Sequence, residues 1–143
     1  MIDRDIIEAK FDIIERNLKF IRDNYLGVPP EKIESSYKDS QALKFSLFEI
    51  VEACIDIANH IIAAKRFERA EEYAKMFITL GKYGVIPQEL AEKLAKMARF
   101  RNLLIHRYWE VDMKYIMEIV ENRLKDVERF MLRIEEYLEK EGI

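Results

Sequence analysis

Residues 40–65 read SQALKFSLFEIVEACIDIANHIIAAK and include the most apolar stretch of the chain. Apolar residues recur there at steps of three and four: Leu43, Leu47, Ile50, Cys54, Ile57 and Ile61. This spacing places them on one stripe of an α-helix. Further apolar residues widen the stripe: Phe45, Phe48, Ile55, Ala58 and Ile62. We therefore predict a helix over 40–65 that is the most buried of the protein.

The same stretch does not have the character of a membrane span. Charged residues interrupt it at Lys44, Glu49, Glu52 and Asp56, and a spanning helix would need about 20 mostly apolar residues. The N-terminus lacks a basic region followed by an apolar run, so no secretory signal is expected. The only cysteine, Cys54, is expected to be a buried small residue in a reducing compartment. We expect a cytoplasmic protein without membrane contact.

The sequence before this helix predicts a second one over 5–25. Its apolar residues alternate at steps of four and three along one stripe. Gly27 can end the helix in a left-handed conformation, and the proline pair at 29–30 prevents its continuation. Residues 31–39 are predicted to form a connector with room for one helical turn.

The sequence after residue 65 predicts three more helices. One covers 69–80 and ends near Gly81. The next has Pro87 in its first turn and carries an apolar stripe as far as residue 105. The last is capped by Asp112 and continues to about Leu138.

The composition agrees with an all-helical protein. The 143 residues include only four glycines and three prolines, so turns are few and the elements must be long. We predict an all-α, up-and-down bundle of about five helices, in one domain over 1–143. The apolar stripes of the outer helices are generous for one small bundle, which favours a homodimer.

Charge is distributed unevenly along the chain. The net charge is −3, yet residues 93–109 contain five basic residues and no acidic ones. That segment carries +5, so the remainder carries −8. The basic residues are Lys93, Lys96, Arg99, Arg101 and Arg107. This pattern indicates a local anionic ligand, and a solvated basic helix face is the alternative.

Several common catalytic motifs are missing from the sequence. It contains no glycine-rich phosphate loop, no Cys/His zinc spacing and no G-x-S-x-G string. The Glu-x-x-His pairs of di-iron bundles are also missing, because Ile57 and Leu103 stand three residues before His60 and His106. We predict neither a metal nor a cofactor.

The second histidine lies in the string RFRNLLIHRYW, residues 99–109. In a helix, Asn102 and His106 share one face about 40° wide, while Arg101 and Tyr108 share another about 20° wide. A neutral imidazole beside guanidinium groups could act as a base next to a phosphate clamp. The alternative is that His106 and Tyr108 only close the helix, with the arginines in surface ion pairs.

The string Arg101-x4-His106-x-Tyr108 resembles the R-x4-H-x-Y motif of the HepT family in the HEPN superfamily. The segment Glu52-x3-Asp56 and the following IANHII also resemble that family's second helix. The order and length of the predicted helices agree with the family over essentially the whole chain. The resemblance implies a HEPN-like fold, a homodimer that brings two motifs into one cleft, and metal-independent endoribonuclease activity.

The resemblance also implies a role and a partner. HepT toxins are usually encoded beside a minimal nucleotidyltransferase antitoxin of the MntA type. That partner transfers AMP from ATP onto the motif tyrosine, here Tyr108. AMPylation would place negative phosphate beside Arg101 and would repel RNA.

The residue types allow a mechanism for RNA cleavage. His106 is expected to take the proton of the 2′-hydroxyl, and Arg101 to stabilise charge on the phosphoryl oxygens. The product would be a 2′,3′-cyclic phosphate. Asn102 is expected to orient the substrate or His106. Arg99 and Arg107 are the predicted basic patch for the RNA substrate.

A polar stripe in the helix over 40–65 allows three interpretations. Its members are Glu52, Asp56, Asn59 and His60. They could form a supporting network that orients Arg101 across the bundle, or simply be surface polarity. Asp56 and His60 could also bind a metal, although two ligands are few.

Two other functions compete with the ribonuclease. The first is a non-catalytic HEPN module that binds a nucleotide or serves as an adaptor for a nucleotidyltransferase. The second is a helical dimer used only for assembly. The Arg101–His106 pair favours the ribonuclease, because a scaffold needs neither residue.

Overall fold

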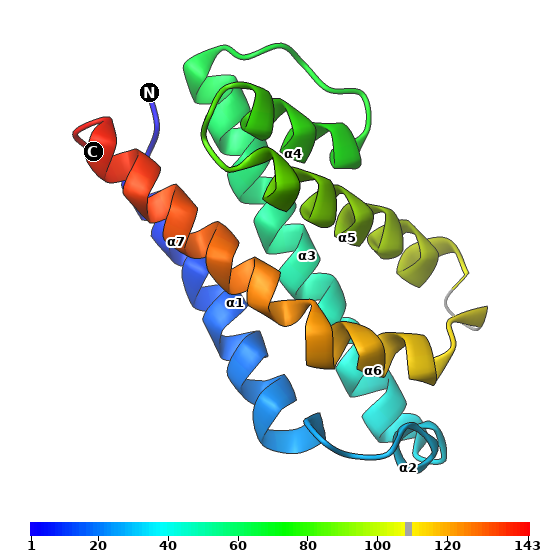
Figure 1. Cartoon of the computed structure of the whole chain (residues 1–143). Helices are drawn as coiled ribbons and strands as arrows, with labels where there is room; N and C mark the ends of the chain where they lie inside the picture. The colour runs from blue at the N-terminus through cyan, green and yellow to red at the C-terminus, as the bar shows by residue number, and fades with distance from the viewer. Residues whose placement is uncertain (108–109) are drawn as a thin grey trace.

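The computed structural model describes residues 1–107 and 110–143, and its elements are α-helices (Figure 1). They are α1 (Arg4–Tyr25), α2 (Pro30–Glu34), α3 (Tyr37–Lys65), α4 (Tyr73–Lys82), α5 (Gln88–His106), α6 (Met113–Asn122) and α7 (Leu124–Lys140). The predicted all-α class is confirmed.

The longest helix, α3, lies in the middle of the bundle (Figure 1). α1 packs along it on one side, and the hairpin of α4 and α5 packs against it on the other. α7 contacts both α1 and α5, while α6 reaches from the end of α5 towards α2. This arrangement places the last turns of α5 beside the middle of α3, where the predicted site lies.

Side-chain caps fix the start of several helices. The carboxylate of Asp3 accepts from the backbone N–H of Asp5 at 2.9 Å at the start of α1. Asp112 caps α6 in the same way, accepting from Lys114 N–H at 2.9 Å, as predicted. At the other end of α1, Gly27 has φ +80°, the left-handed conformation that the sequence required of it.

The structure differs from the predicted helices in three places. Ser36 caps α3, accepting from the Asp39 N–H at 3.2 Å, so α3 begins at Tyr37. α4 begins at Tyr73, four residues after the predicted start at 69, whereas the short helix α2 is the helical turn for which the connector had room. The predicted last helix is divided at Arg123, where φ is −113°, so the described residues form seven helices rather than about five. This change of direction lets α6 contact α2 while α7 follows α1 and α5.

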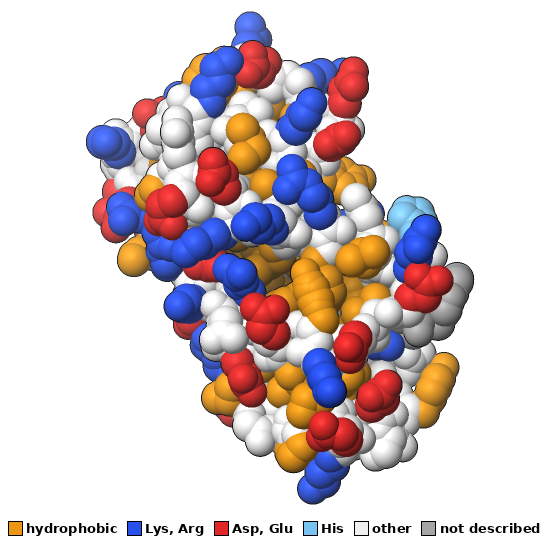
Figure 2. Space-filling model, turned by 45° about the vertical axis from the view of Figure 1, so that its right-hand side comes forward, with side chains coloured by type: hydrophobic (Ala, Val, Ile, Leu, Met, Phe, Trp, Pro, Cys, Tyr) orange, Lys and Arg blue, Asp and Glu red, His pale blue; other side chains and the backbone are white. Residues whose placement is uncertain are grey.

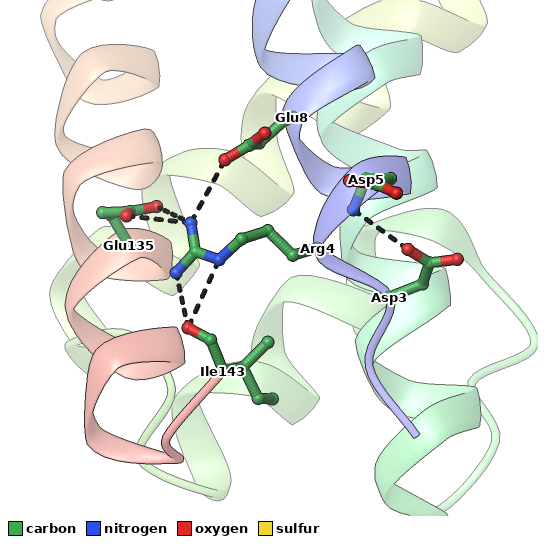
Figure 3. Close-up of polar contacts among 6 residues, drawn as sticks. All are labelled: Asp3, Arg4, Asp5, Glu8, Glu135 and Ile143. Carbon is green, nitrogen blue, oxygen red and sulfur yellow. Dashed lines mark hydrogen bonds and ion pairs between the residues drawn. The ribbon is translucent and has the colours of Figure 1, made fainter.

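The two ends of the described chain are joined by Arg4 (Figure 3). Its Nη1 donates to the Glu135 carboxylate at 3.0 and 3.2 Å, and its Nη2 donates to the Ile143 carbonyl at 2.7 Å. Hydrogen bonds between a guanidinium and a carboxylate are stronger than neutral ones. The first turn of α1 is therefore attached to the end of α7.

The predicted stripe of α3 is buried, with Leu43, Ile50 and Ile61 at 0% exposure. Cys54 is buried as expected, and burial raises the pKa of its thiol. Phe45 is the exception: it is 60% exposed, so it does not belong to the core of this chain. Within residues 1–107 and 110–143, no helix combines the length and apolarity needed to cross a membrane.

Candidate active site

Arg101 lies on the side of α5 that faces α3. Its Nε donates to the Glu52 carboxylate of α3, and its Nη1 lies 3.4 Å from Asn102 Oδ1. The guanidinium carbon stands 4.7 Å from the ring centre of Tyr73 and 5.7 Å from that of Phe48. Three helices thus hold one cation: α3 supplies a carboxylate and a ring, α4 supplies a second ring, and α5 carries the arginine.

This environment suits a fixed anion-binding group. The Arg101 side chain is 15% exposed, and the Glu52 side chain is 28% exposed, so the pair is largely removed from solvent. Guanidinium groups stay charged and pack well on aromatic faces. With Nε engaged by Glu52, the Nη groups can donate to a phosphate in a set orientation.

His106 is the last residue of α5 and is exposed. In the described part of the chain, its imidazole makes no hydrogen bond or ion pair. It lies five positions after Arg101, which is about 7.5 Å along the helix and about 140° around it. One chain therefore presents the two predicted catalytic side chains on different sides of α5. Asn102 is exposed on the same side as His106.

The remaining predicted positions on α3 lie away from Arg101. Asp56 pairs with Lys10 of α1 at 2.9 Å. His60 Nε2 accepts from the backbone N–H of Asp3 at 2.9 Å. Both side chains connect α3 to α1 and the N-terminal residues. Of the polar stripe on α3, Glu52 makes the contact with Arg101.

The predicted basic patch divides into two kinds of residue. Arg99 is exposed and makes no ion pair with the described residues. Arg107 follows α5 directly, and its Nη1 donates to Glu110 at 3.2 Å. Tyr108, the predicted modification site, lies outside the described residues.

Two contributors to the site were not predicted from the sequence. Tyr73 begins α4 and Phe48 lies on α3, and their rings flank the Arg101 guanidinium. The spacing of Phe48 identified a helix stripe, but no local pattern connected either ring with an arginine far away in the chain. Only the packing of α4 and α5 on α3 brings the three together.

An apolar hollow of about 470 Å³ adjoins this arginine. It is lined by Gln41, Lys44, Phe45, Phe48, Leu104 and Ile105. The exposed Phe45 ring stands 6.3 Å from the Phe48 ring, and Ile105 is 40% exposed. Exposed apolar side chains of α3 and of the end of α5 therefore lie together on this face.

The chain is similar to proteins named as nucleases along most of its length. The family model described as Ribonuclease HepT-like matches residues 14–134. The mRNA nuclease HepT of Shewanella oneidensis is 33% identical over 127 residues, covering 89% of this chain and 94% of that protein. The tRNA nuclease HepT of Aphanizomenon flos-aquae is 27% identical over 137 residues, covering 96% and 92%.

Solved structures give the same result. The tri-AMPylated Shewanella oneidensis HEPN toxin, solved in complex with MNT antitoxin, matches with a TM-score of 0.84 and 30% identity. The match covers 92% of this chain and 98% of that chain. Fold and sequence together define the class of protein, an all-helical, RNA-cleaving enzyme. The chain belongs to the HepT-like ribonuclease family, which confirms the family predicted from the R-x4-H-x-Y string.

Proposed function

We propose that this protein is the toxin of a HepT/MntA-type toxin–antitoxin pair and cleaves RNA without a metal. The observation that carries the proposal is the Arg101 guanidinium, held by Glu52 between the rings of Tyr73 and Phe48. A cation fixed in this way can bind the scissile phosphate and stabilise the charge that develops on its oxygens. Family membership supplies the substrate class.

The chemistry assigned to the site is an internal transfer within RNA. The 2′-oxygen attacks the adjacent phosphorus, and the P–O5′ bond breaks. His106 removes the 2′-hydroxyl proton as general base, and the departing 5′-oxygen takes up a proton from a general acid. The products are a 2′,3′-cyclic phosphate and a 5′-hydroxyl. Asn102 orients the substrate or His106, and Arg99 and Arg107 bind neighbouring phosphates.

We infer that the mechanism uses a homodimer, because one chain does not bring the two predicted catalytic side chains together. In one chain, Arg101 and His106 leave α5 about 140° apart. The apolar hollow around Phe45 and Ile105 lies between them and continues up to Arg101 through Phe48. Pairing two copies through this face would bury the exposed ring and bring two motifs into one cleft. The same dimer makes the His106 of a second copy a candidate for the general acid.

Silencing is assigned to Tyr108 and an MntA-type nucleotidyltransferase. The proposal rests on the AMPylated state and the antitoxin complex of the similar Shewanella oneidensis toxin. A phosphate-bearing adduct near the motif would compete with RNA for the cation of Arg101.

The test is RNA cleavage by purified protein in EDTA, after the intact mass has shown that the protein is free of AMP. Wild type should cleave and leave cyclic phosphate ends, whereas His106→Ala and Arg101→Ala should lose at least a hundredfold in rate. Full activity in His106→Ala would refute the assigned mechanism. Absence of cleavage by unmodified wild type on several RNAs would refute the proposed function and favour the adaptor.

A further inference from the structure

A second surface of α5, away from Arg101, lines a groove against α6. The residues that line it are Lys93, Lys96, Met97, Phe100, Tyr115, Glu118, Ile119 and Arg123. Figure 2 shows basic side chains gathered beside an apolar hollow on one face of the molecule. We name this surface the α5–α6 groove. It contains none of the residues to which the proposed function assigns a role.

The cations of the groove outnumber its acids. Lys96 and Arg123 make no ion pair within the described part of the chain. Lys93 lies 3.6 Å from Glu89, a carboxylate that also pairs with Arg129. Glu118 is the one acidic residue among those lining the groove. Two unpaired cations on one surface of an otherwise acidic protein favour an anionic ligand.

The floor between these cations is apolar and aromatic. The rings of Phe100 and Tyr115 pack edge to face, with their centres 5.4 Å apart. Tyr115 is 42% exposed, so part of its ring is open to a ligand. Proteins that bind single-stranded nucleic acid typically combine cations along the phosphate backbone with an exposed aromatic ring on which a base can stack.

The groove leads towards the predicted catalytic end of α5. An adjoining hollow of about 300 Å³ shares Phe100 and Tyr115 and continues to Arg107. Its lining also includes Glu110, which pairs with Arg107, and Asp112, which caps α6. Lys96 and His106 are ten residues apart on α5, which is about 15 Å along the helix axis. Stacked nucleotides rise about 3.4 Å each, so this distance corresponds to about four nucleotides.

We propose that the α5–α6 groove binds single-stranded RNA about four nucleotides from His106, with Lys96 and Arg123 on the backbone and Tyr115 under a base. The proposal rests on the proposed ribonuclease function for its substrate class. It predicts that long RNAs are bound by a surface that very short RNAs do not reach.

The test measures binding separately from cleavage. Fluorescence anisotropy would follow a labelled 12-nucleotide RNA on full-length His106→Ala protein at several salt concentrations. The test variant adds Lys96→Gln and Arg123→Gln. The matched control adds Arg16→Gln and Lys38→Gln, which remove two exposed cations that also lack ion pairs in the described part of the chain.

Loss of two phosphate contacts should reduce the slope of log K against log salt by about 1.4, and so weaken binding about tenfold at 0.15 M salt. The control should stay within about twofold of the parent. Tyr115→Leu keeps an apolar side chain but removes the stacking face, so we expect at least about a fivefold loss.

The outcomes separate the two proposals. An unchanged slope and affinity in the Lys96/Arg123 variant would overturn the groove proposal, even if wild type cleaves RNA, and would favour a protein partner there. Binding of the 12-mer too weak to measure would overturn it as well. A selective loss of binding, with no cleavage by wild type, would support the groove and refute the ribonuclease.

Discussion

The contact between Glu52 and Arg101 gives a prediction that connects stability with the site. Glu52→Ala removes the carboxylate that accepts from Arg101 Nε and leaves a guanidinium that is only 15% exposed. Exposed ion pairs contribute about 0–1 kcal/mol, whereas breaking a fully buried pair costs about 3–5 kcal/mol. The partial burial of this pair indicates an intermediate cost of about 2 kcal/mol.

For a domain of this size, 2 kcal/mol corresponds to a Tm decrease of about 4–8 °C, measurable by circular dichroism at 222 nm. Glu52→Gln keeps an acceptor but loses the charge, and should have about half the effect. Glu49→Ala is the matched control, because Glu49 lies one turn earlier on α3, is also half-buried and makes no ion pair with the described residues.

The same variants should act on catalysis. Without the Glu52 side chain, Arg101 is free to change orientation, so Glu52→Ala should lower kcat about tenfold or more and change KM little, since the group acts in the transition state. Glu52→Gln keeps an acceptor and should lower kcat less. A Glu52→Ala protein that melts within 1 °C of wild type and cleaves RNA at the same rate would refute the role of Glu52 as a positioning residue.

Three further predictions concern the rest of the fold. Burial, together with a 3.0 Å hydrogen bond to Asp39, raises the pKa of Tyr25 to about 12, whereas the pKa in the unfolded chain is about 10. The free energy of unfolding should therefore keep its full value below pH 10 and fall as the pH rises towards 12. In urea unfolding between pH 10 and 12, the free energy of unfolding should fall less steeply for Tyr25→Phe than for wild type. An equal fall in both proteins would contradict the raised pKa of Tyr25. A Cβ at Gly81 would lie 2.9 Å from the Ala91 Cβ, so Gly81→Ala should lower the free energy of unfolding by about 1–3 kcal/mol. In a double-mutant cycle, Gly81→Ala should cost less when Ala91→Gly is also present, and an equal cost in both backgrounds would argue against the clash. Phe130→Ala empties a site with 0% exposure and should lower the free energy of unfolding by about 3–5 kcal/mol, whereas a loss below 1 kcal/mol would mean that the core is not packed as described.

Much of the helical structure could be read from local patterns. The stripe over 40–65, the cap at Asp112 and the stop at Gly27 depend on interactions within a few residues, so periodicity and capping rules identified them. The division at Arg123 was missed because the apolar stripe continues through it. The direction of a helix after such a break depends on the helices that α6 and α7 contact. An apolar stripe shows which side of a helix is buried, but not which helices pack against it.

In the candidate site, too, some features follow from the local sequence and others depend on how the helices pack. By itself, the sequence determined the all-helical class and the presence of Arg101 and His106 on the same short segment, because both follow from residue types and their spacing. It also indicated the family, through the resemblance of the R-x4-H-x-Y string to a known motif. Only the tertiary structure decided that Glu52, rather than Asp56 or His60, holds the arginine, and that Tyr73 and Phe48 flank it. The physical reason is that contacts between α3, α4 and α5 depend on how the helices rotate and pack against one another, and many rotations are compatible with the same apolar periodicity.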